Sequence, residues 1–140
     1  MKRIALITAM AAMASVVLAK PKLIYIPISL GAATGGTNTS EKVVGYVEEV
    51  QMSVSDGAAT GLCSVAIQPA DSTVAAYNLA TNTVSDEKRF YPVRDNTDIA
   101  GTALTSDEPG RFFLIGDTVT FTVTGSSTNK TWRCRIKITE

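Results

Sequence analysis

Hydrophobic and polar residues alternate with a period of two along most of the chain after residue 20. The pattern is clearest in Thr118–Thr124, where threonine alternates with valine and phenylalanine, and in the segment that ends the chain. Successive side chains of a β-strand point to opposite faces, so this period predicts strands rather than helices. We expect the inner faces of these two strands to fill a core made of Val119, Phe121, Val123, Trp132, Ile136 and Ile138.

The other expected strands are less regular and lie at 22–30, 43–55, 61–68, 73–79, 88–94 and 111–115. In 43–55 the apolar positions change phase, from odd numbers at Val43 and Val47 to even numbers at Val50 and beyond. One extra residue reverses the faces of a strand, so we expect a β-bulge near Glu48-Glu49. The sequence therefore predicts an all-β fold, a single β-sandwich of seven or eight mainly antiparallel strands, either jelly-roll or immunoglobulin-like.

The chain divides into three expected parts: residues 1–19, residues 20–42 and a sandwich core at residues 43–140. In the first part, Lys2 and Arg3 precede an apolar run from Ile4 to Ala19. This order is typical of a secretory signal peptide, and a retained arm or anchor is the alternative. The run is shorter than the ~20 residues of a membrane-spanning helix. We expect membrane contact only if the segment is retained as an anchor.

Residues 20–42 are expected to hold an edge strand and a flexible glycine-rich loop over 31–42. Pro27 has no N–H to donate, which favours an edge position, and sheet edges are natural docking surfaces. A cationic stripe on the last strand is a second candidate surface, although a charged solvent face is its simpler interpretation. The expected assembly contacts are Ile24, Tyr25, Ile26, Pro27, Ile28, Arg133, Arg135 and Lys137. Deleting residues 1–42 is expected to weaken attachment more than folding.

Charge and composition argue against several function classes. The 13 basic residues balance the 13 acidic ones, so no strong field would attract nucleic acid. The chain has no histidine, which removes the usual nucleophile pairs and every zinc site that uses imidazole. No motif gathers carboxylates or lysines for catalysis. We therefore expect no enzyme, no cofactor, no bound metal and no nucleic-acid partner.

The two cysteines, Cys63 and Cys134, both fall on core-facing positions of expected strands. In an oxidising compartment they would form a disulfide that closes a long loop, worth ~4 kcal/mol by the chain-entropy estimate. In a reducing compartment they would be two buried thiols that pack as small hydrophobic groups. The choice between the two follows the fate of residues 1–19.

The stretch from Lys88 to Glu140 resembles small β-sandwich virion proteins of tailed bacteriophages. The similarity rests on Phe90-Tyr91-Pro92 with Arg94, on Asp98–Thr105, on Arg111-Phe112 and on Gly116-Asp117, with a similar style in Val44–Val50. Together these segments cover about half of the chain. The resemblance implies a capsid decoration, cement or fibre-base subunit on the capsid surface with no catalytic residues. It also implies contacts with the major capsid protein or other virion subunits and self-association.

A secreted or periplasmic surface domain, similar to an adhesin, is the alternative function. The signal-like start and the two cysteines favour it, whereas a virion protein assembled in the cytoplasm needs no secretion signal. Neighbouring genes separate the two hypotheses. Capsid, portal and terminase genes would favour the virion, and secretion or pilus genes would favour the surface domain.

Overall fold

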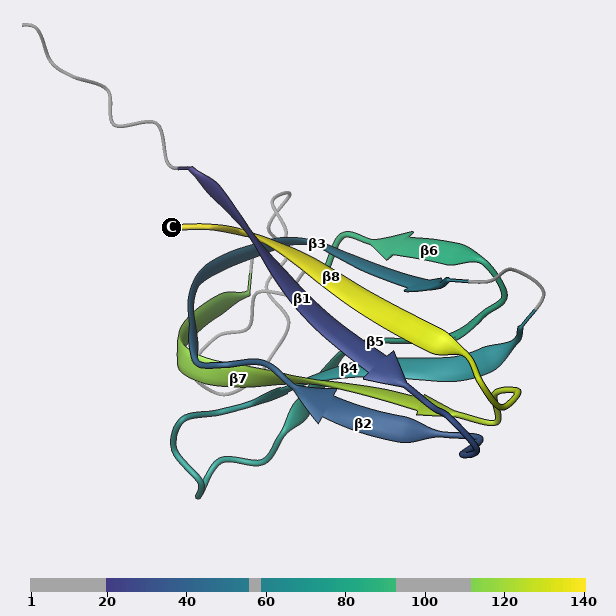
Figure 1. Cartoon of the computed structure of the whole chain (residues 1–140). Coiled ribbons are helices and arrows are strands. Elements are labelled where there is room, and N and C mark those ends of the chain that lie inside the picture. The colour runs from purple at the N-terminus through teal and green to yellow at the C-terminus, as the bar shows by residue number, and fades with distance from the viewer. Residues whose placement is uncertain (1–19, 56–58, 93–111) are drawn as a thin grey trace, which may run out of the picture.

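The computed structural model describes residues 20–55, 59–92 and 112–140, and these residues form eight β-strands and no helix (Figure 1). Consequently, no helix in these ranges is long and apolar enough to cross a membrane. The predicted all-β class is confirmed. The strands are β1 (Pro21–Ser29), β2 (Gly36–Thr39), β3 (Val43–Val54), β4 (Gly61–Gln68), β5 (Tyr77–Val84), β6 (Glu87–Phe90), β7 (Phe113–Thr124) and β8 (Thr131–Thr139).

All pairings among these strands are antiparallel, and one continuous hydrogen-bonded path folds into two layers. The first layer has the order β1-β8-β3-β6, and the second layer has the order β2-β7-β4-β5. Figure 1 shows β1, β8, β3 and β6 above β2, β7 and β4. This strand order is that of a jelly roll, one of the two sandwich types that the sequence left open.

Strand β7 joins the two layers. Its first half, Phe113–Asp117, pairs with β3 in the first layer, and its second half, Thr118–Thr124, pairs with β4 in the second layer. Gly116 lies at the change of layer with a φ of 70°, a left-handed conformation that glycine adopts without steric cost. The sequence predicted two separate strands on either side of this glycine, 111–115 and Thr118–Thr124, whereas the structure has one continuous strand that bends there.

The inner faces of the two layers share one core of alternating apolar residues. Trp132 lies fully buried near the start of β8, where its indole N–H donates a hydrogen bond to Ser126 Oγ in the β7–β8 turn at 2.9 Å. Because a buried indole N–H would be costly without an acceptor, this bond lets a large aromatic ring occupy the core. The expected core residues all have 0% exposure: Val119, Phe121, Val123, Trp132, Ile136 and Ile138.

The predicted bulge in β3 is confirmed. Val47 pairs with Ile138, but the next residue of β8, Lys137, pairs with Glu49, so Glu48 is the extra residue. The insertion lets Val47 and Val50 both face the core, although their positions differ by an odd number. The phase change of the apolar residues therefore located a real irregularity of the backbone.

The structure also differs from the expected elements at residues 31–42 and at the start of β5. The stretch expected to be a loop, 31–42, contains β2, whose Thr37 and Thr39 pair with β7. Strand β5 begins at Tyr77 rather than near residue 73, because Asp71 forms a turn there. The Asp71 carboxylate accepts hydrogen bonds from the Thr73 amide at 2.9 Å and the Thr73 hydroxyl at 2.7 Å. Such side-chain bonds to nearby backbone compete with strand pairing.

Strand β1 lies at an edge of the described sheet, as Pro27 predicted, yet it is also part of the core. All nine of its residues pair with β8, and Ile26, Ile28 and Leu30 are buried. Residues 20–42 thus belong to the sandwich. A deletion of residues 1–42 would therefore remove core side chains and a paired strand, so we expect it to weaken folding as well as attachment.

Candidate functional site

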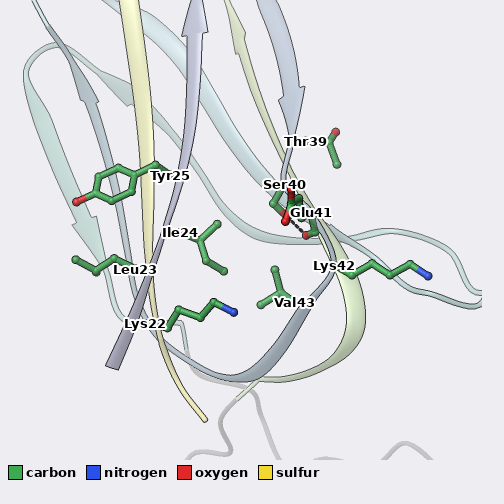
Figure 2. Close-up of a pocket in the computed structure, with 9 residues that line it drawn as sticks. All are labelled: Lys22, Leu23, Ile24, Tyr25, Thr39, Ser40, Glu41, Lys42 and Val43. Carbon is green, nitrogen blue, oxygen red and sulfur yellow. Dashed lines mark hydrogen bonds between the residues drawn. The ribbon is translucent and has the colours of Figure 1, made fainter. Parts of the chain in front are cut away.

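A groove of about 370 Å³ opens between β1 and the connection from β2 to β3 (Figure 2). One wall is Lys22–Tyr25 of β1, and the other is Thr39–Val43. Figure 2 shows Ile24 and Val43 pointing toward each other across the groove. Ile24 is half-buried against the core and Val43 is buried, so the floor between the walls is apolar.

Ser40 holds the second wall of the groove in place. Its amide donates to the Val119 carbonyl at 2.9 Å, and its hydroxyl accepts from the Val119 amide at 2.9 Å. This pair of bonds ties the end of β2 to β7 before Glu41 and Lys42 cross to the first layer. The wall is therefore attached to the sandwich on the side away from β1, and the groove is a built feature.

The free edge of β1 directs backbone groups into this groove. The side chain of Asn38 donates to the Pro27 carbonyl at 2.7 Å, so this carbonyl faces β2 and away from β8. In an antiparallel pair, residues that bond to the neighbouring strand alternate with residues that point away from it. Leu23 and Tyr25 share the phase of Pro27, which turns their N–H and C=O groups toward the groove.

Two prolines limit the length of this edge. Pro21 and Pro27 occupy the same phase as Leu23 and Tyr25 but have no N–H to donate. Proline at an edge is a common way to prevent unspecific pairing with other chains. The prolines leave a short window, centred on Leu23 and Tyr25, in which an added strand would find both donors and acceptors.

The outward face of the first layer lies beside this edge and carries charge. Tyr25 is opposite Arg135 of β8, which is opposite Gln51 of β3. A shallow depression of about 250 Å³ lies over these three residues, with Arg133 and Glu87 also lining it. The predicted cationic stripe of Arg133, Arg135 and Lys137 is thus on the surface of the same layer as β1.

Acidic side chains on β3 and β6 lie beside the stripe. Arg89 forms ion pairs with Glu87 at 2.7 Å and with Glu49 at 3.7 Å. The pKa of the Glu87 carboxyl is lowered, first by its hydrogen bond with Arg89, then by one with Gln51, and also by the charge of Arg135. The face is therefore a mixed pattern of charges, which would select a partner by complementarity rather than attract any polyanion.

The structure divides the predicted contact residues into two groups. Tyr25 and Pro27 are exposed, Ile24 is half-buried in the groove, and the three cations of β8 lie on the outward face. Ile26 and Ile28 are only 1% and 6% exposed, because the period of β1 turns them into the core. The prediction that Ile26 and Ile28 contact a partner is wrong for the folded domain.

Cys63 and Cys134 are free and buried in the structure. Cys63 belongs to β4 in the second layer and Cys134 to β8 in the first layer, so they approach the shared core from opposite sides. Burial raises the pKa of each thiol to about 12, and for Cys134 the nearby Cys63 adds to the effect. Both thiols are therefore protonated and unreactive at neutral pH in the folded state.

Sequence reasoning missed the second wall of the groove, because it treated 31–42 as a flexible loop. The signal was present in Thr37 and Thr39, which alternate like the threonines of β7 and meet them with hydroxyl contacts of 3.1 Å. It also missed that apolar residues occur on both faces at the start of β3 and β7. Val43-Val44 and Phe112–Ile115 break the period of two, which indicates that both faces carry apolar side chains there.

No group of three or more acidic or cysteine side chains is close enough to hold a metal ion in the parts of the chain that the structure describes. Much of the segment behind the virion resemblance, including Arg94 and Asp98–Thr105, lies outside the described residues. Comparison of the chain with protein-family models, with curated proteins and with solved structures finds no match.

Proposed function

We propose that this protein is a non-enzymatic virion subunit, a capsid decoration or cement protein that works by stoichiometric assembly. Its attachment uses the free edge of β1, onto which an extended segment of the major capsid protein or another virion subunit adds as a further strand. The observation that carries the proposal is the window of backbone donors and acceptors at Leu23 and Tyr25, which opens into a groove with an apolar floor.

Strand addition needs three features, and the site supplies each of them. Main-chain groups provide affinity, and those of Leu23 and Tyr25 face the groove. A pocket for alternate side chains provides specificity, and Ile24 and Val43 line one. A limited edge prevents uncontrolled pairing, and the prolines that flank the window provide this limit.

The fold and the charges around the groove also support a subunit that binds a capsid in many copies. The jelly-roll arrangement is common to viral capsid and lectin domains, although the fold alone does not define a function. The mixed charges beside β1 would orient the subunit on its partner. A contact of a few residues is weak by itself, but subunits that also associate with one another would bind the capsid at several linked sites, which raises their effective affinity.

A proline scan of the window tests the proposal with a matched control. In Tyr25→Pro the N–H that faces the groove is lost, while the bonds to β8 are kept, because residues of this phase point away from β8. Tyr25→Ala removes the same side chain but keeps the N–H. We expect Tyr25→Pro to co-sediment with purified capsids about fivefold more weakly than Tyr25→Ala, since one hydrogen bond is worth roughly 1 kcal/mol.

Thermal melts of both variants check that the fold is intact, as Pro27 shows that this phase of β1 accepts proline. Equal attachment of the two variants would mean that the backbone of β1 is not the docking edge. If the unaltered protein does not bind capsids at all, the virion function is wrong. The secreted adhesin-like binding domain then becomes the leading function, and its test is binding to bacterial surface components.

A further inference from the structure

Four apolar side chains are exposed together where β3 and β7 begin. Val44 pairs with Ile115, and Tyr46 pairs with Phe113, so the four form two adjacent cross-strand pairs on the outward face of the first layer. Their exposed fractions are 51% for Val44, 69% for Ile115, 45% for Tyr46 and 44% for Phe113. The rings of Tyr46 and Phe113 are 4.5 Å apart between centroids. We call these four residues the corner patch.

The corner patch is too regular to be scattered surface hydrophobicity. Gly45 lies between Val44 and Tyr46 with a φ of 130°, and an added Cβ there would be 2.5 Å from the Ile138 side chain. The glycine lets β3 pack closely on β8 while its two neighbours turn outward. A contiguous exposed apolar patch often marks an interaction site.

The size of the corner patch argues against a second copy as its occupant. A stable interface buries about 800 Å² on each partner, and four side chains that are roughly half exposed offer well under that area. A segment tethered to the same chain needs much less contact, because its effective concentration is in the millimolar range for a short linker. The best occupant is therefore an apolar segment of this chain.

The start of β1 lies in the same row of the first layer as two residues of the corner patch. Pro21 pairs with Thr139, Thr139 pairs with Tyr46, and Tyr46 pairs with Phe113, so the four lie in one row across the first layer. Figure 1 shows the C-terminus beside the start of β1. Strands β1 and β3 run in the same direction, so Val44 lies beyond the level of Pro21, on the side from which the chain enters β1.

Residues 1–19 have both the composition and the length for this role. The run from Ile4 to Ala19 is apolar except for Thr8 and Ser15. Three strand spacings of ~4.8 Å separate Pro21 from Phe113, a distance that about five extended residues span at ~3.3 Å each. More than half of the run would then remain to cover the corner patch.

We infer that the apolar segment Ile4–Ala19, in chains that retain it, packs on the corner patch of its own domain and covers Val44, Tyr46, Phe113 and Ile115. Removal of the segment by cleavage would expose the patch. This assignment does not depend on the proposed docking at β1, because the corner patch is on the outward face of the sheet and the groove is at its edge.

Hydroxyl-radical footprinting of the full chain, synthesised without membranes, tests the inference. Tyr25, which is 61% exposed in the same layer, is the internal reference. The rate of Tyr25, scaled by the exposed fractions of the side chains, gives the rates expected for Tyr46 and Phe113 if the patch is uncovered. We expect both residues to react at least threefold more slowly than these rates. The double variant Met10→Glu with Met13→Glu should release the segment and restore their reaction, whereas Met10→Leu with Met13→Leu should keep the protection. Emission from Trp132, the single tryptophan, reports that the fold is unchanged.

Three results would overturn the inference. Tyr46 and Phe113 that react as fast as their exposure predicts in the unaltered chain would show that the patch is uncovered. Protection that survives the glutamate variant would assign the cover to another part of the chain. Protection that disappears on dilution would show that a second copy, rather than the chain's own segment, covers the patch.

Discussion

The two layers of this sandwich have similar inner faces and very different outer faces. Toward the core, both alternate apolar residues in the same way. Toward solvent, the first layer carries Glu49, Arg89 and the cations of β8, together with the exposed corner patch. The second layer has no charged residue in β2, β4, β5 or the second half of β7. Its outer face is mainly threonine, serine and asparagine.

The inner faces meet the requirements of folding, whereas the outer faces differ in the groups that they offer to a partner. Folding needs the inner alternation, and threonine on the outer face satisfies both strand propensity and solubility. In the second layer the hydroxyl groups bond to each other across β2 and β7, at 3.1 Å in both Thr37–Thr122 and Thr39–Thr120. The first layer carries features that the fold does not need, namely the limited edge, the mixed charges and the corner patch. These features are the reason that we propose the first layer as the surface that binds a partner.

The largest expected effect is on the core that both layers share. Trp132→Ala should lower the free energy of unfolding by about 3–5 kcal/mol, because it leaves a cavity and removes the partner of Ser126. Urea unfolding followed by circular dichroism measures the change, with Trp132→Phe as the milder control. Hydrogen exchange should accelerate equally in both layers. Faster exchange in one layer alone would show that the layers unfold separately.

Gly45→Ala should act on the first layer. An added Cβ would be 2.5 Å from the Ile138 side chain and 2.8 Å from the Thr139 carbonyl oxygen, at a φ of 130° that alanine rarely adopts. We expect a loss of about 2–4 kcal/mol and faster exchange of amides in β3 and β8. Gly31→Ala is the control, since its φ is also positive but its Cβ would have open space. Equal losses in both variants would assign the effect to the backbone conformation alone.

The two buried thiols, one in each layer, make the stability of the domain depend on pH. The pKa of each buried thiol is about 12, against 9.0 for an unperturbed cysteine. Between these values the unfolded chain loses protons first, so the stability present below pH 9 declines as the pH rises toward 12, by at most ~1.4 kcal/mol per pH unit per thiol. Urea titrations at pH 8 and 10.5 measure the free energy of unfolding at the two pH values. The same titrations of the double variant Cys63→Ala/Cys134→Ala show how much of the change comes from the thiols.

At pH 8 both thiols should react with a thiol reagent only as fast as the whole domain opens. Faster labelling of Cys63 alone would mean that the second layer opens independently. Quantitative labelling of both after unfolding would show that they are reduced. If neither is labelled after unfolding until a reductant is added, the cysteines are joined in a disulfide.

The smallest effect should come from the outer face of the second layer. Thr120→Val and Thr122→Val keep the shape and strand propensity and remove only exposed hydroxyl groups. We expect stability changes within about 0.5 kcal/mol and unchanged co-sedimentation with capsids. A marked loss of attachment by these variants would contradict the proposal that the first layer binds the partner.

The two strands at the end of the chain show why part of this fold is readable from the sequence. In Thr118–Thr124 and in β8, every inward residue is apolar and every outward residue is polar, so one short pattern identifies both the strand and its buried face. The phase change around Glu48 carried enough information to locate a bulge. Strand β2 was not predicted from the sequence because it is short, contains no large apolar residue, and depends on threonine contacts with β7.

The candidate site was only partly predictable for a similar reason. Pro27 indicated an edge, and the exposed residues Tyr25 and Pro27 lie there as expected. The alternation that identified β1 as a strand should also have placed Ile26 and Ile28 inward. Ile26 and Ile28 were assigned as contacts because they belong to an edge strand, but a residue of an edge strand can still point its side chain into the core.

The sequence by itself determined the all-β class, the inward residues of the clearest strands and the bulge in β3, because a period of two is a local property that neighbouring residues express directly. Only the tertiary structure decided that the order of the layers is a jelly roll, that β1 and Thr39–Val43 line one groove, and that Val44 and Ile115 meet. These features join residues far apart in the chain. Such pairings depend on which layers pack together and how β7 bends between them, and no local pattern encodes that choice.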